Sequence, residues 1–149
     1  MEKTLIILRG LPSSGKTTFA KMLVQAHWCE NTSGPSADIE SRSVMFAADD
    51  YFANREFDHR ALGAAHEQCR VNVSNAMAEA VPLIIVHNTN VKASEVAPYV
   101  RLAEDNRYRY FVLSLGDGGL TDEELAARNT HGVPQRTMTN MRRKFQFDM

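Results

Sequence analysis

The chain of 149 residues has the length of one compact domain and is too short to enclose two ordinary cores. Its composition is 44% hydrophobic and 23% charged, which excludes collagen-like and disordered chains, and no apolar run reaches the ~18 residues of a membrane-spanning helix. The net charge of −1 argues against a protein that coats nucleic acid through bulk electrostatics. We expect a cytoplasmic protein, because the first residues lack the cleavage site of a secretory signal.

The charge is unevenly distributed along the chain. Residues 30–58 carry seven acidic and two basic side chains, a net of −5, whereas residues 126–149 carry five basic and one acidic, a net of +4. A phosphate-bearing partner is therefore expected nearer the C-terminal segment. Within that segment, Arg142, Arg143 and Lys144 are interpreted as a solvated face rather than a binding patch.

The predicted elements alternate between short apolar runs and stretches of helical period. The apolar runs predict strands at residues 4–8, 43–48, 83–86 and 108–115. Periodicity, a capping box and a well-placed proline predict helices at residues 16–27, 59–80, about 94–106, 121–129 and from 134 onward. Residues 30–42 are predicted to be a loop, and Cys29 and Cys69 buried thiols. This alternation implies a three-layer α/β sandwich with a four- to five-stranded, mainly parallel sheet, which binds ligands at the carboxyl ends of its strands.

A phosphate-binding loop follows the first predicted strand. Residues 10–17 read Gly-Leu-Pro-Ser-Ser-Gly-Lys-Thr and match G-x-x-x-x-G-K-[ST] at every fixed position. Glycine lets the backbone approach an anion, and the N–H groups of residues 13–18 can then point into the loop at the positive end of the next helix. Lys16 is expected to reach the β- and γ-phosphates and Thr17 to ligate Mg²⁺. We predict that ATP and Mg²⁺ bind to Gly10, Ser13, Ser14, Gly15, Lys16, Thr17 and Thr18.

Other sequence features narrow the class of nucleotide-binding protein. A GTPase would show an [NT]-K-x-D element after an apolar strand, and the chain has none. A ring-forming ATPase would need more chain and a strand that ends in a carboxylate, whereas this strand ends Val86-His87-Asn88. A small kinase needs only the loop, one base and a basic lid, so it fits best.

Candidates for the catalytic base and for the lid lie in different parts of the sequence. Asp49 and Asp50 directly follow the second predicted strand, at the same rim of the sheet as the phosphate-binding loop. Asp49 is the predicted base for the acceptor hydroxyl, and Asp50 is expected to cap the turn that follows. Arg128, between the last two predicted helices, can neutralise charge on the transferring phosphoryl group, although an arginine at a helix end is equally often a solvated dipole partner.

Four blocks of the chain, at residues 8–18, 48–52, 88–90 and 125–134, follow one another in the order of a known family. Through these blocks most of the chain resembles the polynucleotide-kinase-type P-loop kinases, which include the phage-type 5′-kinase domain and small AAA-domain ATP-binding proteins. The resemblance implies that Lys16 and Thr17 bind ATP·Mg²⁺, that Asp49 deprotonates a 5′-hydroxyl and that Arg128 is the arginine of a short helical lid. Asn88 and Asn90 would lie on the acceptor side of the cleft.

The chain departs from that family pattern at three places. Phe52 stands where phage-type kinases have an arginine three residues after the base, which leaves Arg55 to recognise an acceptor phosphate. His87 and Asn88 stand where the family usually has an aspartate. His131 lies where the second lid arginine falls, and it is a weaker cation that depends on pH.

The leading hypothesis is one kinase domain over residues 1–149 that transfers the γ-phosphoryl group of ATP to a hydroxyl of a nucleic acid or nucleotide. Two alternatives within this class are phosphorylation of a hydroxymethylated base in DNA, such as hydroxymethyluracil, and phosphorylation of a small metabolite. An alternative from another class is a nucleotide-binding interaction module with little turnover, because no acid stands at residues 87–88. Contact with nucleic acid would be local, with no membrane partner.

Overall fold

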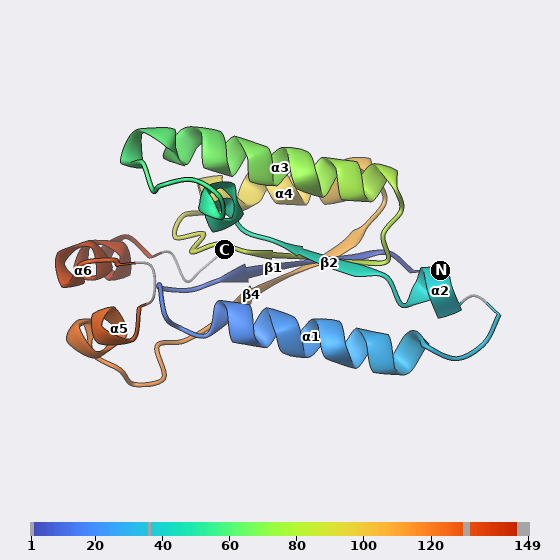
Figure 1. Ribbon diagram of the computed structural model, residues 1–149, viewed down its shortest axis with the longest axis horizontal. Coiled ribbons are helices and arrows are strands. Elements are labelled where there is room, and N and C mark those ends of the chain that lie inside the picture. The colour runs from blue at the N-terminus through green and yellow to red at the C-terminus, as the bar shows by residue number, and fades with distance from the viewer. Residues whose placement is uncertain (1, 36, 130–131, 146–149) are drawn as a thin grey trace.

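The computed structural model describes residues 2–35, 37–129 and 132–145. Its four strands form one parallel sheet in the order β2-β3-β1-β4 (Figure 1). The strands are β1 (Thr4–Arg9), β2 (Ser43–Phe46), β3 (Leu83–His87) and β4 (Arg109–Ser114). All four predicted strands are therefore confirmed, with ends that move by one or two residues.

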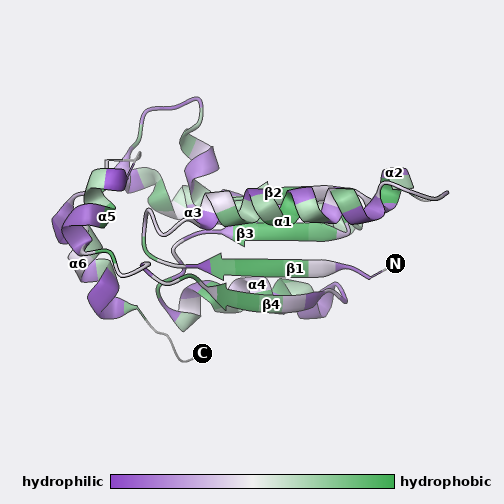
Figure 2. Ribbon diagram, turned by 90° about the horizontal axis from the view of Figure 1, so that it is seen from below, coloured by the Kyte–Doolittle hydropathy of each residue, from purple (hydrophilic) through white to green (hydrophobic). Residues whose placement is uncertain are grey.

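Helices cover both faces of the sheet and make the predicted three layers. The helix α1 (Lys16–Asn31) lies on one face, and α3 (Leu62–Ala78) and α4 (Ala93–Asp105) lie on the other (Figure 1). Because side chains alternate along a strand, Leu5 and Ile7 of β1 pack toward α3 and α4, whereas Leu8 packs toward α1. The central strands β1 and β3 are consequently apolar on both faces, as the continuous runs in their sequences predict (Figure 2).

Two short helices, α5 (Asp122–Arg128) and α6 (Gln135–Lys144), lie at the carboxyl end of the sheet (Figures 1 and 2). Thr121 caps α5 as predicted, since its hydroxyl accepts a hydrogen bond from the N–H of Glu124 at 3.2 Å. The pair is fixed to the rest of the protein by a third apolar cluster, composed of Leu11, Val91, Leu125, Met138 and Phe145. The predicted helical lid is thus packed directly against the phosphate-binding loop through Leu11.

Two sequence-based expectations are wrong outside the sheet. The predicted loop at residues 30–42 contains the end of α1 and a short helix α2 (Ala37–Glu40). Cys69 is buried as expected, whereas Cys29 is exposed. Cys29 lies in the last turns of α1 beside the exposed Trp28, where the helix buries none of its residues. Apolar spacing alone does not show where a helix stops packing against the sheet.

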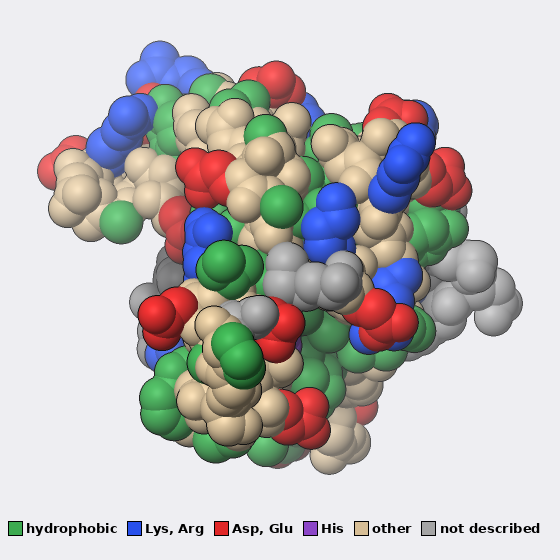
Figure 3. Space-filling view, turned by 90° about the vertical axis from the view of Figure 1, so that its right-hand side faces the viewer, with side chains coloured by type: hydrophobic (Ala, Val, Ile, Leu, Met, Phe, Trp, Pro, Cys, Tyr) green, Lys and Arg blue, Asp and Glu red, His purple; other side chains and the backbone are tan. Residues whose placement is uncertain are grey.

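The described surface mixes charges of both signs. Figure 3 looks at the end of the molecule that carries α2, and it shows Lys, Arg, Asp and Glu side chains interspersed, with no continuous basic area among the described residues of this face. Within the described residues, no helix combines the length and the apolar character needed to cross a membrane.

Candidate active site

The phosphate-binding loop connects the end of β1 to the start of α1. Its backbone turns through left-handed conformations at Ser13 (φ 66°) and Gly15 (φ 97°). Gly10 is required for another reason, since a Cβ there would lie 2.6 Å from the Ser14 hydroxyl and 3.1 Å from the Leu115 carbonyl. The loop is fixed at its start by the Gly10 N–H, which donates to the Thr89 carbonyl at 3.0 Å. Left-handed turns of this kind are typical of loops whose successive N–H groups bind an anion.

Lys16 folds back onto the loop itself. Its ammonium donates to the carbonyls of Gly10 at 2.9 Å and Leu11 at 2.8 Å, and the residue is only 9% exposed. Burial lowers the pKa of Lys16 to about 8, and the nearby carboxylate of Asp49 opposes that shift. The hydroxyl of Ser14 is also buried and has no hydrogen-bond partner among the described residues. A cation and an unsatisfied donor inside the loop fit a phosphate ligand.

Thr17 and His87 meet at the carboxyl ends of β1 and β3. Thr17 is exposed in the first turn of α1, so its hydroxyl is available to a cation carried by bound phosphates, and the site fits Mg²⁺ in this respect. The hydroxyl lies 3.4 Å from Nδ1 of His87, the last residue of β3. Burial lowers the pKa of His87, while Asp50 raises it and Lys16 lowers it further.

The two aspartates that follow β2 have different roles. They lie in a single 3₁₀ turn over Ala48–Phe52. The Asp50 carboxylate accepts a hydrogen bond from the Ala47 N–H at 2.9 Å, which confirms the predicted capping role. Asp49 is exposed, and its charge acts on both Lys16 and His87. The structure therefore brings Asp49 to the same rim as the phosphate-binding loop.

Asn88 and Asn90 are placed differently from the acceptor contacts that the resemblance implies, because both are buried within the protein. Oδ1 of Asn88 accepts from the Ala48 N–H at 2.8 Å, and its amide donates to the Tyr99 hydroxyl at 3.4 Å. The Asn90 amide donates to the Leu8 carbonyl at 2.9 Å. These side chains therefore position the turn of Asp49 and the end of β1, and both polar groups of Asn88 and the amide of Asn90 are already paired inside the fold.

Sequence reasoning missed Arg9, which has no exposed surface. Its guanidinium donates to the Asn90 carbonyl and the Val91 carbonyl, each at 2.9 Å, and to the Ser114 hydroxyl at 3.1 Å. The same group lies 4.1 Å from the centre of the Phe145 ring. An arginine at the end of an apolar strand was the available signal, since a charge there must be paired when the strand end is buried.

The other predicted basic residues lie at the edge of the site. Arg55 is exposed and stacks on the Tyr51 ring at 4.1 Å, within the segment that follows Asp49. Arg128 is exposed in the last turn of α5. The structure does not pair either side chain with the phosphate-binding loop. The predicted contact of His131 lies outside the described residues.

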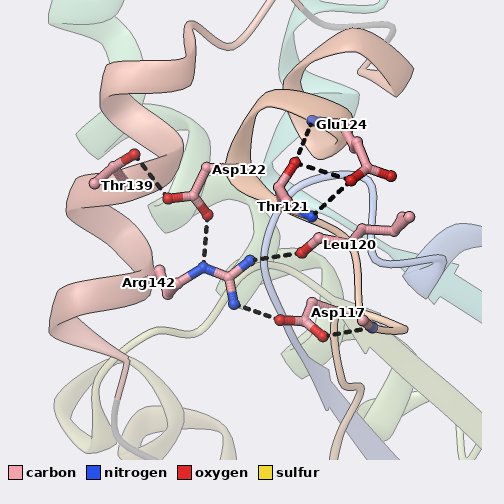
Figure 4. Close-up of polar contacts among 8 residues, drawn as sticks. Asp117, Leu120, Thr121, Asp122, Glu124, Thr139 and Arg142 are labelled. Atoms are coloured by element: carbon pink, nitrogen blue, oxygen red, sulfur yellow. Dashed lines mark hydrogen bonds and ion pairs between the residues drawn. The ribbon is translucent and has the colours of Figure 1, made fainter.

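Arg142 corrects the interpretation of Arg142, Arg143 and Lys144 as a solvated face. Its guanidinium forms ion pairs with Asp117 and with Asp122 and donates to the Leu120 carbonyl, while Asp122 also accepts from the Thr139 hydroxyl (Figure 4). These hydrogen bonds lower the pKa of both aspartates. The network joins α6, α5 and the loop after β4, whereas the neighbouring Arg143 is exposed.

The chain is similar in sequence to a curated protein and in fold to several solved structures. The curated human protein NEDD4-binding protein 2 is 34% identical over 146 residues, which are 95% of this chain and 8% of that protein. The Pnkp1/Rnl/Hen1 RNA repair complex contains a chain with 19% identity and a TM-score of 0.60, over 99% of this chain and 47% of that chain. Chaetomium thermophilum Kti12, solved with ADP-AlF3, has 19% identity and a TM-score of 0.63, over 95% and 80%.

The same fold is found in an APS kinase and a gluconokinase. The family described as "AAA domain" matches residues 5–147. The chain therefore belongs to this AAA-domain family and has the fold of P-loop kinases.

Proposed function

We propose that residues 1–149 act as an ATP-dependent kinase that transfers the γ-phosphoryl group to a hydroxyl of a nucleic acid or nucleotide, in the manner of a 5′-hydroxyl polynucleotide kinase. The observation that carries this proposal is the electrostatic coupling of Asp49 to Lys16 across the rim of the sheet. A base for the acceptor and a cation for the phosphates then lie at the same rim of the sheet, as phosphoryl transfer requires.

Each residue has a defined task in this proposal. The loop N–H groups and Lys16 bind the phosphates of ATP, and Lys16 exchanges its contacts to the Gly10 and Leu11 carbonyls for phosphate oxygens. Mg²⁺, when bound through Thr17, neutralises phosphate charge. Asp49 accepts the proton of the acceptor hydroxyl as that oxygen attacks the γ-phosphorus, and ADP leaves. Arg128 approaches the phosphates from the lid.

The segment after Asp49 supports an acceptor that carries a nucleobase. Tyr51 and Phe52 form an edge-to-face pair with ring centres 5.2 Å apart, and Phe52 lies 5.1 Å from Phe57, which is 65% exposed. Arg55 extends this group, because its guanidinium stacks on the Tyr51 ring. Aromatic rings and arginine planes are the surfaces on which nucleobases stack in single-stranded nucleic acids. The Pnkp1/Rnl/Hen1 neighbour is an RNA repair complex, which agrees with such an acceptor.

Transfer from γ-labelled ATP to a panel of acceptors tests the proposal. The panel contains DNA and RNA with 5′-hydroxyl ends, DNA with hydroxymethyluracil, and free nucleosides. We expect label on the 5′-hydroxyl ends, and none with Lys16→Ala, which removes both ATP binding and transfer. Label confined to hydroxymethyluracil DNA would replace this acceptor with a modified base. Tight ATP binding without label on any acceptor would overturn the kinase and favour a nucleotide-binding module.

A further inference from the structure

The side chain of His87 occupies the rim of the sheet where the divalent cation of a bound nucleotide would lie. His87 pairs in register with Leu8 at the end of β1, directly before the phosphate-binding loop. Leu83 and Ile85 of the same strand pack toward α1, so alternation places His87 on that face too. There its Nδ1 lies 3.4 Å from the Thr17 hydroxyl, the group expected to ligate the cation.

The spacing of these two atoms suits two ligands of one ion. Neighbouring ligands of an octahedral cation at about 2.1 Å lie about 3 Å apart, close to the distance between Thr17 Oγ1 and His87 Nδ1. Phosphate oxygens and water supply the remaining ligands in nucleotide sites of this kind. A hydroxyl and an imidazole can therefore share the ion without rearrangement of the backbone.

The chemistry of the two donors differs from an all-oxygen site. Mg²⁺ prefers oxygen ligands and binds through carboxylates, phosphates and water. Imidazole is a better ligand for first-row transition ions than for Mg²⁺, and it adds no negative charge. The nearby carboxylates Asp49 and Asp50 act on the ring through space, whereas the atom that lies 3.4 Å from the Thr17 hydroxyl is a ring nitrogen of His87. The cation at this rim would consequently meet a nitrogen lone pair beside that hydroxyl.

We propose that His87 ligates the divalent cation of the bound nucleotide and shifts the preference of the site from Mg²⁺ toward Mn²⁺ and similar nitrogen-accepting ions. This inference rests on the proposed function, because the cation arrives with the nucleotide. His87 thereby becomes a specificity-determining residue for the metal rather than for the acceptor.

Pulsed electron paramagnetic resonance of the Mn²⁺·ADP complex tests the ligand directly, with protein that contains ¹⁵N-labelled histidine. We expect a ¹⁵N coupling in the wild type, its loss in His87→Asp and its retention in His59→Ala, where an exposed histidine outside the site is removed. In parallel, we compare the dissociation constant of ADP in Mg²⁺ with that in Mn²⁺. The first divided by the second should fall about tenfold in His87→Asp, because residues around a metal change its affinity by about this factor.

The outcomes separate the two proposals. ADP that binds without a ¹⁵N coupling, or with an unchanged ratio in His87→Asp, overturns the role of His87 and leaves the kinase intact. If ADP binds in the presence of neither Mg²⁺ nor Mn²⁺, both the role of His87 and the proposed function are overturned. Retention of the coupling in His87→Asp assigns it to another histidine and also overturns the inference.

Discussion

At the scale of single residues, the environment of Lys16 decides how the site responds to pH. The ammonium is buried against two carbonyls of its own loop, and Asp49 is the charge that supports it. Because burial disfavours the charged amine, the pKa of Lys16 lies at about 8. Lys16, the cation proposed to bind phosphate, therefore loses its positive charge as the pH rises through about 8.

The affinity for ATP should fall as the pH rises above about 8. Lys16 is protonated below that pH and neutral above it, while the phosphates keep their charge because their last pKa is near 6. Bound phosphate keeps the Lys16 ammonium protonated. The dissociation constant of ATP, measured by calorimetry, should therefore rise by up to about tenfold per pH unit above 8. Lys21→Ala, which alters an exposed lysine of α1, should keep this profile. A constant affinity from pH 7 to about 9.5 would contradict it.

At the scale of elements, buried polar side chains hold the ends of the strands in place. Asn88 connects the end of β3 to the turn that carries Asp49, and Asn90 connects the following loop to β1. On the lid, Arg142 of α6 joins that helix to α5 through Asp122 and to the loop after β4 through Asp117. The positions of the proposed base and lid thus depend on contacts between elements, which no local pattern specifies.

Replacement of Asn88 by alanine should destabilise the protein by about 1–3 kcal/mol, because the buried Ala48 N–H loses its acceptor. Urea unfolding measures this change. Asn106→Ala is the matched control, since that half-buried amide caps the end of α4 through the Leu102 carbonyl and leaves no strand end unsatisfied. A loss for Asn88→Ala no larger than for the control would show that the amide does not hold the turn.

Arg142→Gln should loosen the lid and leave the sheet unchanged. The variant keeps a polar side chain and loses the ion pairs to Asp117 and Asp122. Amides of α5 and α6 should then exchange with solvent about tenfold faster, while those of β1 and β3 keep their rates. Arg143→Gln, one residue away and exposed, supplies the control. Equal exchange in the two variants would refute the role of the network.

At the scale of the whole molecule, Arg9 connects the parts that the site needs. Its guanidinium reaches the loop after β3, the end of β4 and the Phe145 ring beyond α6. The lid also packs on the phosphate-binding loop through the cluster of Leu11, Val91, Leu125, Met138 and Phe145. Loop, strand ends and lid therefore form one packed unit.

Arg9→Met should lower the free energy of unfolding by about 3 kcal/mol, because the buried carbonyls of Asn90 and Val91 both lose their donor. Chemical denaturation followed by circular dichroism measures the change. Arg101→Met removes an exposed arginine of α4 and should change stability by less than about 0.5 kcal/mol. Similar stabilities of the two variants would contradict the connecting role of Arg9.

Much of this molecule could be predicted from local sequence patterns. Apolar runs indicated the four strands, and the spacing from Gly10 to Thr17 indicated the loop. The roles of Arg9, Asn88 and Arg142 could not be predicted, because their partners lie on other elements and depend on strand order. The short helix α2 was missed because it lies among loop-forming residues.

The central claim is that Asp49 serves as the base of a kinase site whose ATP is bound by other residues. Its most direct test compares the ATP dissociation constant and the phosphoryl transfer rate of Asp49→Asn with those of the wild type. The amide keeps the shape of the carboxylate but accepts no proton, so we predict ATP binding within about twofold and transfer reduced at least about 10²-fold. Near-normal transfer by Asp49→Asn would contradict the account.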